Sequence, residues 1–161
     1  MKKLLAIVLV LSLVAAAAGA WQITEGDDYI LLWKSADYHE GGSLTPPSFG
    51  VRSKDGVVEV LVDFGGPRIA YPRDLHIEVL LQIGNELAEE VEAAVAVGDQ
   101  MVFLDTSVAM DMLYLESRDV VRVGAWPVEG GSVWGEWRIG DFPNMLRRFV
   151  RMRASGREKN L

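Results

Sequence analysis

Few residues of this chain combine a reactive side chain with suitable neighbours. It contains two histidines, His39 and His76, and no cysteine. Imidazole is the commonest general base near neutral pH and the commonest metal ligand, but a serine hydrolase would also need a nucleophile elbow of the Gly-x-Ser-x-Gly type. The sequence has no such elbow, and thiol chemistry requires a cysteine. We therefore expect surface histidines, no catalytic residue and no cofactor.

An acidic cluster extends from Glu86 to Asp99 and includes Glu89, Glu90 and Glu92. Calcium prefers carboxylate oxygens, but its sites need oxygens that converge from a turn, and the spacing of an EF-hand is not present here. On a strand, Glu90 and Glu92 would share one solvated face. We therefore expect no metal site in this cluster.

Three tryptophans, Trp126, Trp134 and Trp137, fall within the last expected hairpin. Because side chains alternate along a strand, Trp134 shares a face with Glu136 and Arg138, whereas Trp137 faces the other way with apolar neighbours. We expect Trp137 in the core. Trp134, flanked by charges, is the candidate for binding a protein partner or for stacking on a glycan, with packing at a sheet edge as the alternative.

A second candidate surface lies near the C-terminal end, where Arg147, Arg148, Arg151 and Arg153 are close together. On a helix, the first three could contact anionic lipid headgroups at a membrane surface or an acidic partner. They could equally form a solvated face that pairs with the domain's own carboxylates. The rest of the chain is acidic, and its formal net charge of −7 argues against nucleic acid as a general partner.

The first twenty residues have the pattern of a secretory signal peptide. A basic start, Met1–Lys3, precedes an apolar run and the small residues Ala18-Gly19-Ala20. The run of about 15 apolar residues is shorter than the roughly 20 that a membrane-spanning helix needs. We therefore expect cleavage after residue 20 and export to the periplasm or beyond the cell, which changes the formal net charge from −7 to −9 because Lys2 and Lys3 are lost.

The remaining chain reads as one β-rich domain, residues 21–153, followed by a flexible tail, residues 154–161. The clearest hairpin spans residues 50–64, where Lys54-Asp55-Gly56 forms the turn between alternating runs. Strands are expected at 21–24, 29–33, 49–53, 57–64, 75–83, 101–104, 120–126 and 133–139. Residues 36–48, which contain a Gly-Gly and a Pro-Pro pair, are expected to form a loop.

Residues 87–97 are ambiguous, because alanine and glutamate favour a helix while the alternation of valine and alanine favours a strand. Their position after a turn leads us to expect a strand. Short helices are expected at 108–117, with Thr106 or Ser107 as the N-cap, and at 142–153, with Asp141 as the N-cap. The expected fold is an antiparallel β-sandwich or open barrel with one short internal helix and a C-terminal helix.

The order of these pieces resembles the VasI-like (TagO-like) accessory proteins associated with bacterial type VI secretion systems. The first three matching stretches in chain order are Gly-Val-Arg-Ser-Lys-Asp-Gly-Val-Val-Glu-Val from Gly50, Val-Leu-Leu-Gln-Ile-Gly-Asn from Val79, and Val-Gly-Asp-Gln-Met-Val-Phe from Val97. Met112-Leu113, Val-Arg-Val from Val121 and the strand that ends in Gly-Asp-Phe at Phe142 follow in the same order. Such proteins often have cysteine where this chain has Ser53, and an aromatic residue where it has Val91.

The resemblance implies an exported β-rich domain without a known catalytic motif, so it assigns no catalytic residue. We expect a non-enzymatic accessory or interaction domain of the cell envelope whose partner is an envelope or secretion-system protein. Two alternatives stay open. A periplasmic glycan-binding or hydrolytic enzyme would show a pocket that joins a histidine to carboxylates, and a small-ligand carrier would show a roomy apolar interior.

Overall fold

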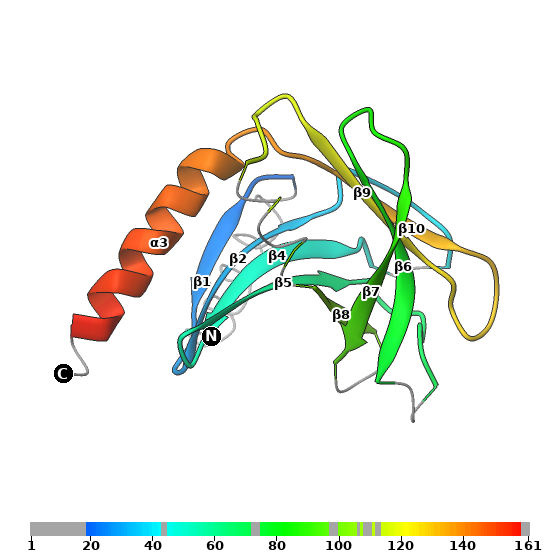
Figure 1. The fold of residues 1–161 in the computed structure, drawn as a ribbon, viewed down its shortest axis with the longest axis horizontal. Coiled ribbons are helices and arrows are strands. Elements are labelled where there is room, and N and C mark those ends of the chain that lie inside the picture. The colour runs from blue at the N-terminus through cyan, green and yellow to red at the C-terminus, as the bar shows by residue number, and fades with distance from the viewer. Residues whose placement is uncertain are drawn as a thin grey trace, which may run out of the picture.

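The computed structural model describes residues 19–42, 45–71, 75–96, 100–105, 107, 111 and 114–158. These residues form one ten-stranded sheet and a long C-terminal helix (Figure 1). The strands are β1 (Gln22–Glu25), β2 (Tyr29–Ser35), β3 (Tyr38–Glu40), β4 (Ser48–Lys54), β5 (Val57–Asp63), β6 (His76–Ile83), β7 (Glu89–Val95), β8 (Met101–Leu104), β9 (Val120–Ala125) and β10 (Val133–Arg138); the helix is α3 (Phe142–Glu158).

The strands are hydrogen-bonded in the order β1-β2-β4-β5-β8-β7-β6-β9-β10-β3, and every neighbouring pair is antiparallel. The sheet curls into a half-barrel, with β1 and β2 beside α3 on one side and β6, β9 and β10 on the other (Figure 1). The expected mainly β fold, in its open-barrel form with a C-terminal helix, is confirmed.

The hairpin of β4 and β5 forms where the sequence predicts it. Lys54 pairs with Val57, and the two residues between them have positive φ, 49° at Asp55 and 82° at Gly56. Positive φ at both central residues defines a type I′ turn, whose twist matches that of the flanking strands. Asp-Gly therefore fixes the register that points Val60 into the core.

The ambiguous segment forms strand β7, as expected, and the helical alternative is wrong. β7 lies between β6 and β8 and pairs with both of them. Hydrogen bonds on both sides outweigh the helix propensity of its alanines and glutamates, because propensity is a weak local preference. Ala93 is buried in the core, while Glu90 and Glu92 are exposed.

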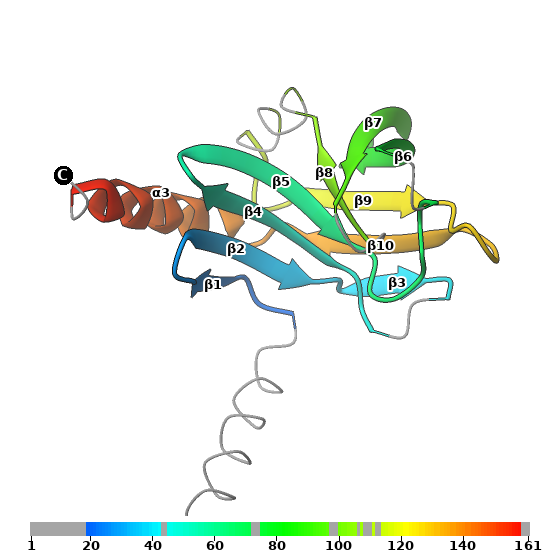
Figure 2. The ribbon, with the colours of Figure 1, turned by 90° about the horizontal axis from the view of Figure 1, so that it is seen from below.

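The two sides of the half-barrel are joined where β2 continues into β3. Only Ala36 and Asp37 separate these two strands in the chain, although β2 and β3 are far apart in the sheet order. Figure 2 shows β3 continuing the direction of β2 and lying beside β10. Strand β3 lies inside the segment expected to be a loop, so that expectation is wrong for Tyr38–Glu40. These three residues become extended because the edge of β10 supplies hydrogen-bond partners.

A buried lysine marks this junction. The Lys34 side chain is 4% exposed, and its Nζ donates to Asp37 Oδ2 at 2.6 Å and to the Arg138 carbonyl at 2.9 Å. Asp37 Oδ2 also accepts from the Arg138 backbone N–H at 2.7 Å. The Trp137 indole N–H donates to the Lys34 carbonyl at 3.1 Å. We call this group of four residues the Lys34 junction; it ties β2 to β10.

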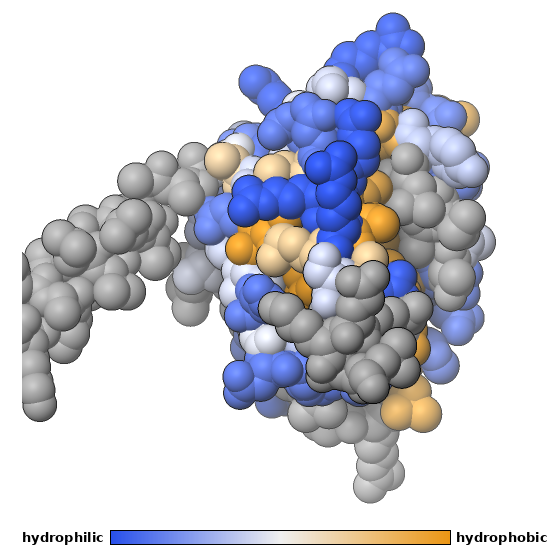
Figure 3. Space-filling model, turned by 90° about the vertical axis from the view of Figure 1, so that its left-hand side faces the viewer, coloured by the Kyte–Doolittle hydropathy of each residue, from blue (hydrophilic) through white to orange (hydrophobic). Residues whose placement is uncertain are grey.

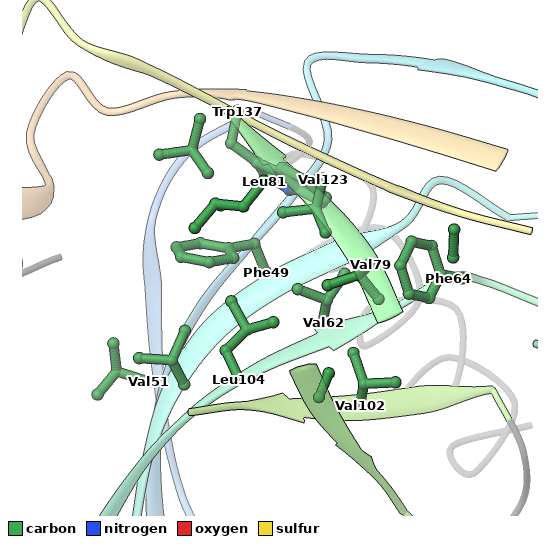
Figure 4. Close-up of a cluster of buried hydrophobic side chains, with 14 of the residues drawn as sticks. Phe49, Val51, Val62, Phe64, Val79, Leu81, Val102, Leu104, Val123 and Trp137 are labelled. Carbon is green, nitrogen blue, oxygen red and sulfur yellow. The ribbon is translucent and has the colours of Figure 1, made fainter. Parts of the chain in front are cut away.

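The concave face of the sheet is filled by side chains. Figure 4 shows Phe49, Val62 and Trp137 among buried residues contributed by strands from both halves of the sheet. Helix α3 packs against β1 and β2 and brings Phe142 and Phe149 into the same core. Trp137 is 0% exposed, which confirms its expected inward direction. Large side chains occupy the space that a small-ligand carrier would need, so the fold offers that alternative no support.

Several boundaries differ from the expectation. Helix α3 extends to Glu158, five residues beyond the expected end, so Ala154–Glu158 are helical rather than part of a tail. Pro143 stands in the first turn and Asp141 precedes it, as expected, although Asp141 Oδ1 accepts from the Asn144 side-chain amide. Residues 159–161 lie outside the described residues.

Half of the short helix expected at 108–117 lies outside the described residues, and so do Thr106 and the signal peptide expected at residues 1–20, apart from Gly19 and Ala20. Asp111 is helical, but residues 114–117 are not, so the expected end of this helix is wrong. Near the expected start of the internal helix, Asp105 accepts from the Ser107 backbone N–H, and the Ser107 hydroxyl donates to the same carboxylate. Asp105 is in the capping position, because N-cap side chains bond two or three residues ahead, and the expectation of Ser107 as the N-cap is wrong, since Ser107 is itself helical. Among the described residues, no helix is long and apolar enough to span a membrane.

Candidate functional site

The outward face of β3, β9 and β10 carries a compact group of aromatic and charged side chains. We call Tyr38, Glu40, Arg122, Trp134 and Glu136 the Trp134 patch. The register places Glu136 between Arg122 and Tyr38 in one row, and Trp134 between Gly124 and Glu40 in the next row. Alternation makes all of these positions point to the same face. The Trp134 side chain is half-buried.

Trp134 lies over a glycine on the neighbouring strand. A Cβ atom added to Gly124 would come within 2.6 Å of the indole atoms Cδ2 and Cε2 and within 2.7 Å of Cε3. The indole therefore occupies the space directly above the Gly124 backbone, which no other residue type at that position would leave open. One side of the ring packs on the sheet, and the remaining surface is available to solvent.

Arg122 is held in place from two directions. Its Nε donates to Glu136 Oε2 at 2.7 Å, and its Nη1 donates to Gln82 Oε1 at 3.1 Å. The Gln82 amide nitrogen is itself bonded to the Glu86 carbonyl at 2.8 Å, which orients its oxygen toward Arg122. A guanidinium has five N–H donors, so these two bonds leave others for a ligand.

Tyr38 and Glu40 form the outer rim of the patch on strand β3. The Tyr38 hydroxyl donates to Glu40 Oε1 at 2.5 Å. This hydrogen bond, together with the negative charges of Glu40 and Glu136, raises the pKa of Tyr38 above its ordinary value near 10. Tyr38 therefore remains a neutral hydrogen-bonding group throughout the physiological range.

The patch encloses a shallow depression of about 200 Å³ lined by its five residues and Gly135. It contains two carboxylates and one guanidinium, so its local charge is negative. An aromatic surface with a hydrogen-bonding rim is suited to binding, since it offers apolar contact and directional polar contacts side by side.

The arginine surface is separate from the Trp134 patch. Arg147, Arg148 and Arg151 lie on α3 and are partly or fully exposed, as expected for a contact face. Trp134 lies near the start of β10, whereas α3 begins after the end of that strand. Figure 3 shows the side of the molecule where α3 lies, with hydrophilic side chains crossing apolar surface.

Arg153, the fourth arginine of the expected group, contacts the β4–β5 hairpin. Arg153 Nη2 donates to the Gly56 carbonyl at 2.5 Å, which attaches α3 to the turn of the β4–β5 hairpin. Arg147 is bonded to Asn144 Oδ1 within the helix, at 2.6 Å. The exposed arginines are thus available to anionic groups, whereas Arg153 positions the helix.

The two histidines lie in different settings. His39 is half-buried in β3 on the face opposite Tyr38. His76 is exposed at the start of β6, and its Nδ1 is 3.9 Å from Glu92 Oε1. It lines a larger hollow of about 550 Å³ together with Glu59, Asp105 and Ser107.

This hollow has some of the residues that an enzyme would need, but two of its carboxylates, Glu59 and Asp105, are already engaged. Glu59 Oε2 accepts from Arg52 Nη2 at 2.6 Å, and Asp105 Oδ1 accepts from both the backbone N–H and the hydroxyl of Ser107 at 2.8 Å. The two bonds from Ser107 lower the pKa of Asp105. The Ser107 hydroxyl therefore donates to a carboxylate rather than to an imidazole base, whereas a nucleophilic serine is activated by such a base. No group of metal-ligating residues occurs among the described residues.

Sequence reasoning identified Trp134 but missed the rest of the patch. Tyr38 and Glu40 fall within the segment expected to be a loop, and Arg122 and Gly124 lie on a different strand, β9. One local signal was available: Arg122 and Gly124 alternate with the buried Val121 and Val123, so both must face outward.

A scan against protein-family models, a search of curated proteins and a search of solved structures found no match to this chain. The functional argument therefore depends on the residues and geometry described above.

Proposed function

We propose that this protein is an exported, non-enzymatic binding domain of the bacterial cell envelope and that the Trp134 patch is its contact surface. The observation that carries the proposal is Trp134 itself, an outward-facing tryptophan that lies over Gly124 and is bordered by oriented polar groups. Tryptophan, tyrosine and arginine are the residues most enriched where binding energy concentrates in interfaces. Three of the five patch residues are of these types.

Export is proposed from the sequence pattern of residues 1–20, in which a basic start, an apolar run and small residues follow one another. An accessory role beside a type VI secretion system is proposed from the order of motifs that begins at Gly50. Binding is favoured over catalysis because Glu59 and Asp105, which line the hollow with His76, are hydrogen-bonded by Arg52 and Ser107, and Glu92 Oε1 is 3.9 Å from His76 Nδ1.

The proposal is tested by affinity capture from envelope extracts with the tagged protein and two variants. Trp134→Ala removes the centre of the patch. Trp33→Ala is the matched control, because Trp33 is also a half-buried tryptophan but lies on β2, where its indole N–H donates to Thr24. We expect Trp134→Ala to lose envelope components that both the unaltered protein and Trp33→Ala retain. Equal recovery with all three proteins would reject the Trp134 patch as the contact surface.

A further inference from the structure

We propose that the ligand of the Trp134 patch is an uncharged, β-linked glycan chain whose sugar rings stack on Trp134. This inference rests on the proposed function, because it takes the Trp134 patch as the contact surface. It goes further by naming the chemical class of the ligand.

The position of the indole favours a flat ligand with C–H groups on its face. Because Gly124 has no Cβ, the Trp134 ring lies down on the sheet backbone instead of standing on its edge. The face of an aromatic ring is electronegative and attracts weakly positive hydrogens. A sugar ring whose hydroxyls are all equatorial presents axial C–H groups on its faces, so it complements an indole that lies flat.

Polar side chains border this aromatic surface, because Arg122, Glu40 and Glu136 line the same depression as Trp134. Arg122 is held by Glu136 and Gln82, so its remaining N–H groups have a defined direction. Glu40 and Glu136 provide carboxylate acceptors, and one oxygen of Glu40 also fixes the Tyr38 hydroxyl. Hydroxyls both donate and accept hydrogen bonds, and this mixture of fixed donors and acceptors matches them better than it matches a purely apolar ligand.

Charge argues for a neutral chain. The Trp134 patch has two carboxylates for one guanidinium, and that guanidinium is already paired with Glu136 at 2.7 Å. The whole chain has a formal net charge of −7. An anionic polysaccharide would therefore meet repulsion both locally and at long range.

The arrangement of exposed aromatic residues suits a chain longer than one sugar. Tyr38, which is 56% exposed, is the diagonal neighbour of Trp134 across the β3–β10 pair. Trp126, which is 52% exposed, directly follows β9. Diagonal neighbours in a sheet are about 7–8 Å apart, so Tyr38 and Trp134 can contact neighbouring sugars of one chain.

The inference is tested by titrating the purified protein with hexamers of β-1,4-linked N-acetylglucosamine and of β-1,4-linked glucose, by calorimetry and by tryptophan fluorescence. An oligomer of galacturonic acid serves as the anionic comparison. Two variants perturb the patch: Trp134→Ala removes the ring, and Gly124→Ala keeps the ring but adds a Cβ where the indole lies. Trp33→Ala is the matched control, and thermal melting verifies that each variant is folded.

We expect saturable binding of at least one neutral hexamer, weakened tenfold or more by Trp134→Ala and by Gly124→Ala and unchanged by Trp33→Ala. The inference is overturned if neither neutral hexamer binds, if Trp134→Ala leaves binding unchanged, or if the anionic oligomer binds more tightly. Absence of glycan binding combined with Trp134-dependent capture of an envelope protein would overturn the glycan while the proposed function survives.

Discussion

Replacement of Asp37 by asparagine should destabilise the fold through the Lys34 junction. Asp37 Oδ2 accepts from both Lys34 Nζ and the Arg138 backbone N–H, and the Lys34 side chain is almost fully buried. The asparagine side chain would keep an acceptor of similar size but remove the negative charge. The Lys34 ammonium would then have only neutral acceptors in the junction, the Arg138 carbonyl at 2.9 Å and the asparagine oxygen, and no compensating charge.

The magnitude follows from the burial of the two groups. Removing one partner of a buried ion pair costs about 3–5 kcal/mol, because the other charge remains buried without compensation. The Asp37 side chain is 24% exposed, so water can partly replace it. We therefore expect the free energy of unfolding to fall by about 3 kcal/mol. For a domain of this size, that loss lowers Tm by about 10 °C.

Thermal melts and urea unfolding followed by circular dichroism measure both quantities. The companion variants are Lys34→Met and the double variant that combines it with Asp37→Asn. If the buried charge causes the loss, the double variant should be more stable than Asp37→Asn alone, because methionine fills the space without a charge. A change in Tm below about 2 °C for Asp37→Asn, or a double variant as unstable as the sum of the single ones, would refute this reasoning.

Three further predictions concern the helix and the rim of the patch. Phe149→Ala, at a side chain that is 1% exposed, should lower the free energy of unfolding by about 3–5 kcal/mol, and urea unfolding measures this loss; a change below about 1 kcal/mol would contradict the packing of α3 on the core. Because the hydrogen bond to Glu40 raises the pKa of Tyr38, Glu40→Gln should let this tyrosine ionise at lower pH; the absorbance difference from Tyr38→Phe measures its titration, and an unchanged midpoint would contradict the contact. Replacement of both Arg147 and Arg151 by glutamate should weaken binding to anionic vesicles at low salt without changing Tm, because both side chains are exposed; unchanged vesicle binding would assign them to a solvated face.

The parts of the fold that depend on neighbouring residues in the chain could be predicted. Trp137 points inward and Trp134 outward because side-chain direction alternates with every residue of a strand. The turn at Asp55-Gly56 is likewise local, since two residues with positive φ define its type.

The parts that depend on distant contacts could not be predicted. Strand β3 has only the polar sequence Tyr-His-Glu, and it is extended because β10 lies beside it. Strand β9 is inserted between β6 and β10, which brings Arg122 to Gln82, forty residues earlier in the chain. The candidate site was therefore visible only as Trp134, and its rim required the order of the strands.

The extent of α3 also shows a limit of local patterns. Residues 154–158 contain serine and glycine, which are weak helix formers, yet the helix continues through them. The bond from Arg153 to the Gly56 carbonyl holds the last turns of the helix against the β4–β5 hairpin. This contact spans 97 residues of sequence, which no local pattern shows.

The most direct test of the central claim is the fraction of purified protein that sediments with isolated cell envelopes. The account predicts that Trp134→Ala reduces the bound fraction severalfold, whereas Trp33→Ala binds as well as the unaltered protein. Equal sedimentation of the two variants would contradict the claim that the Trp134 patch is the binding surface.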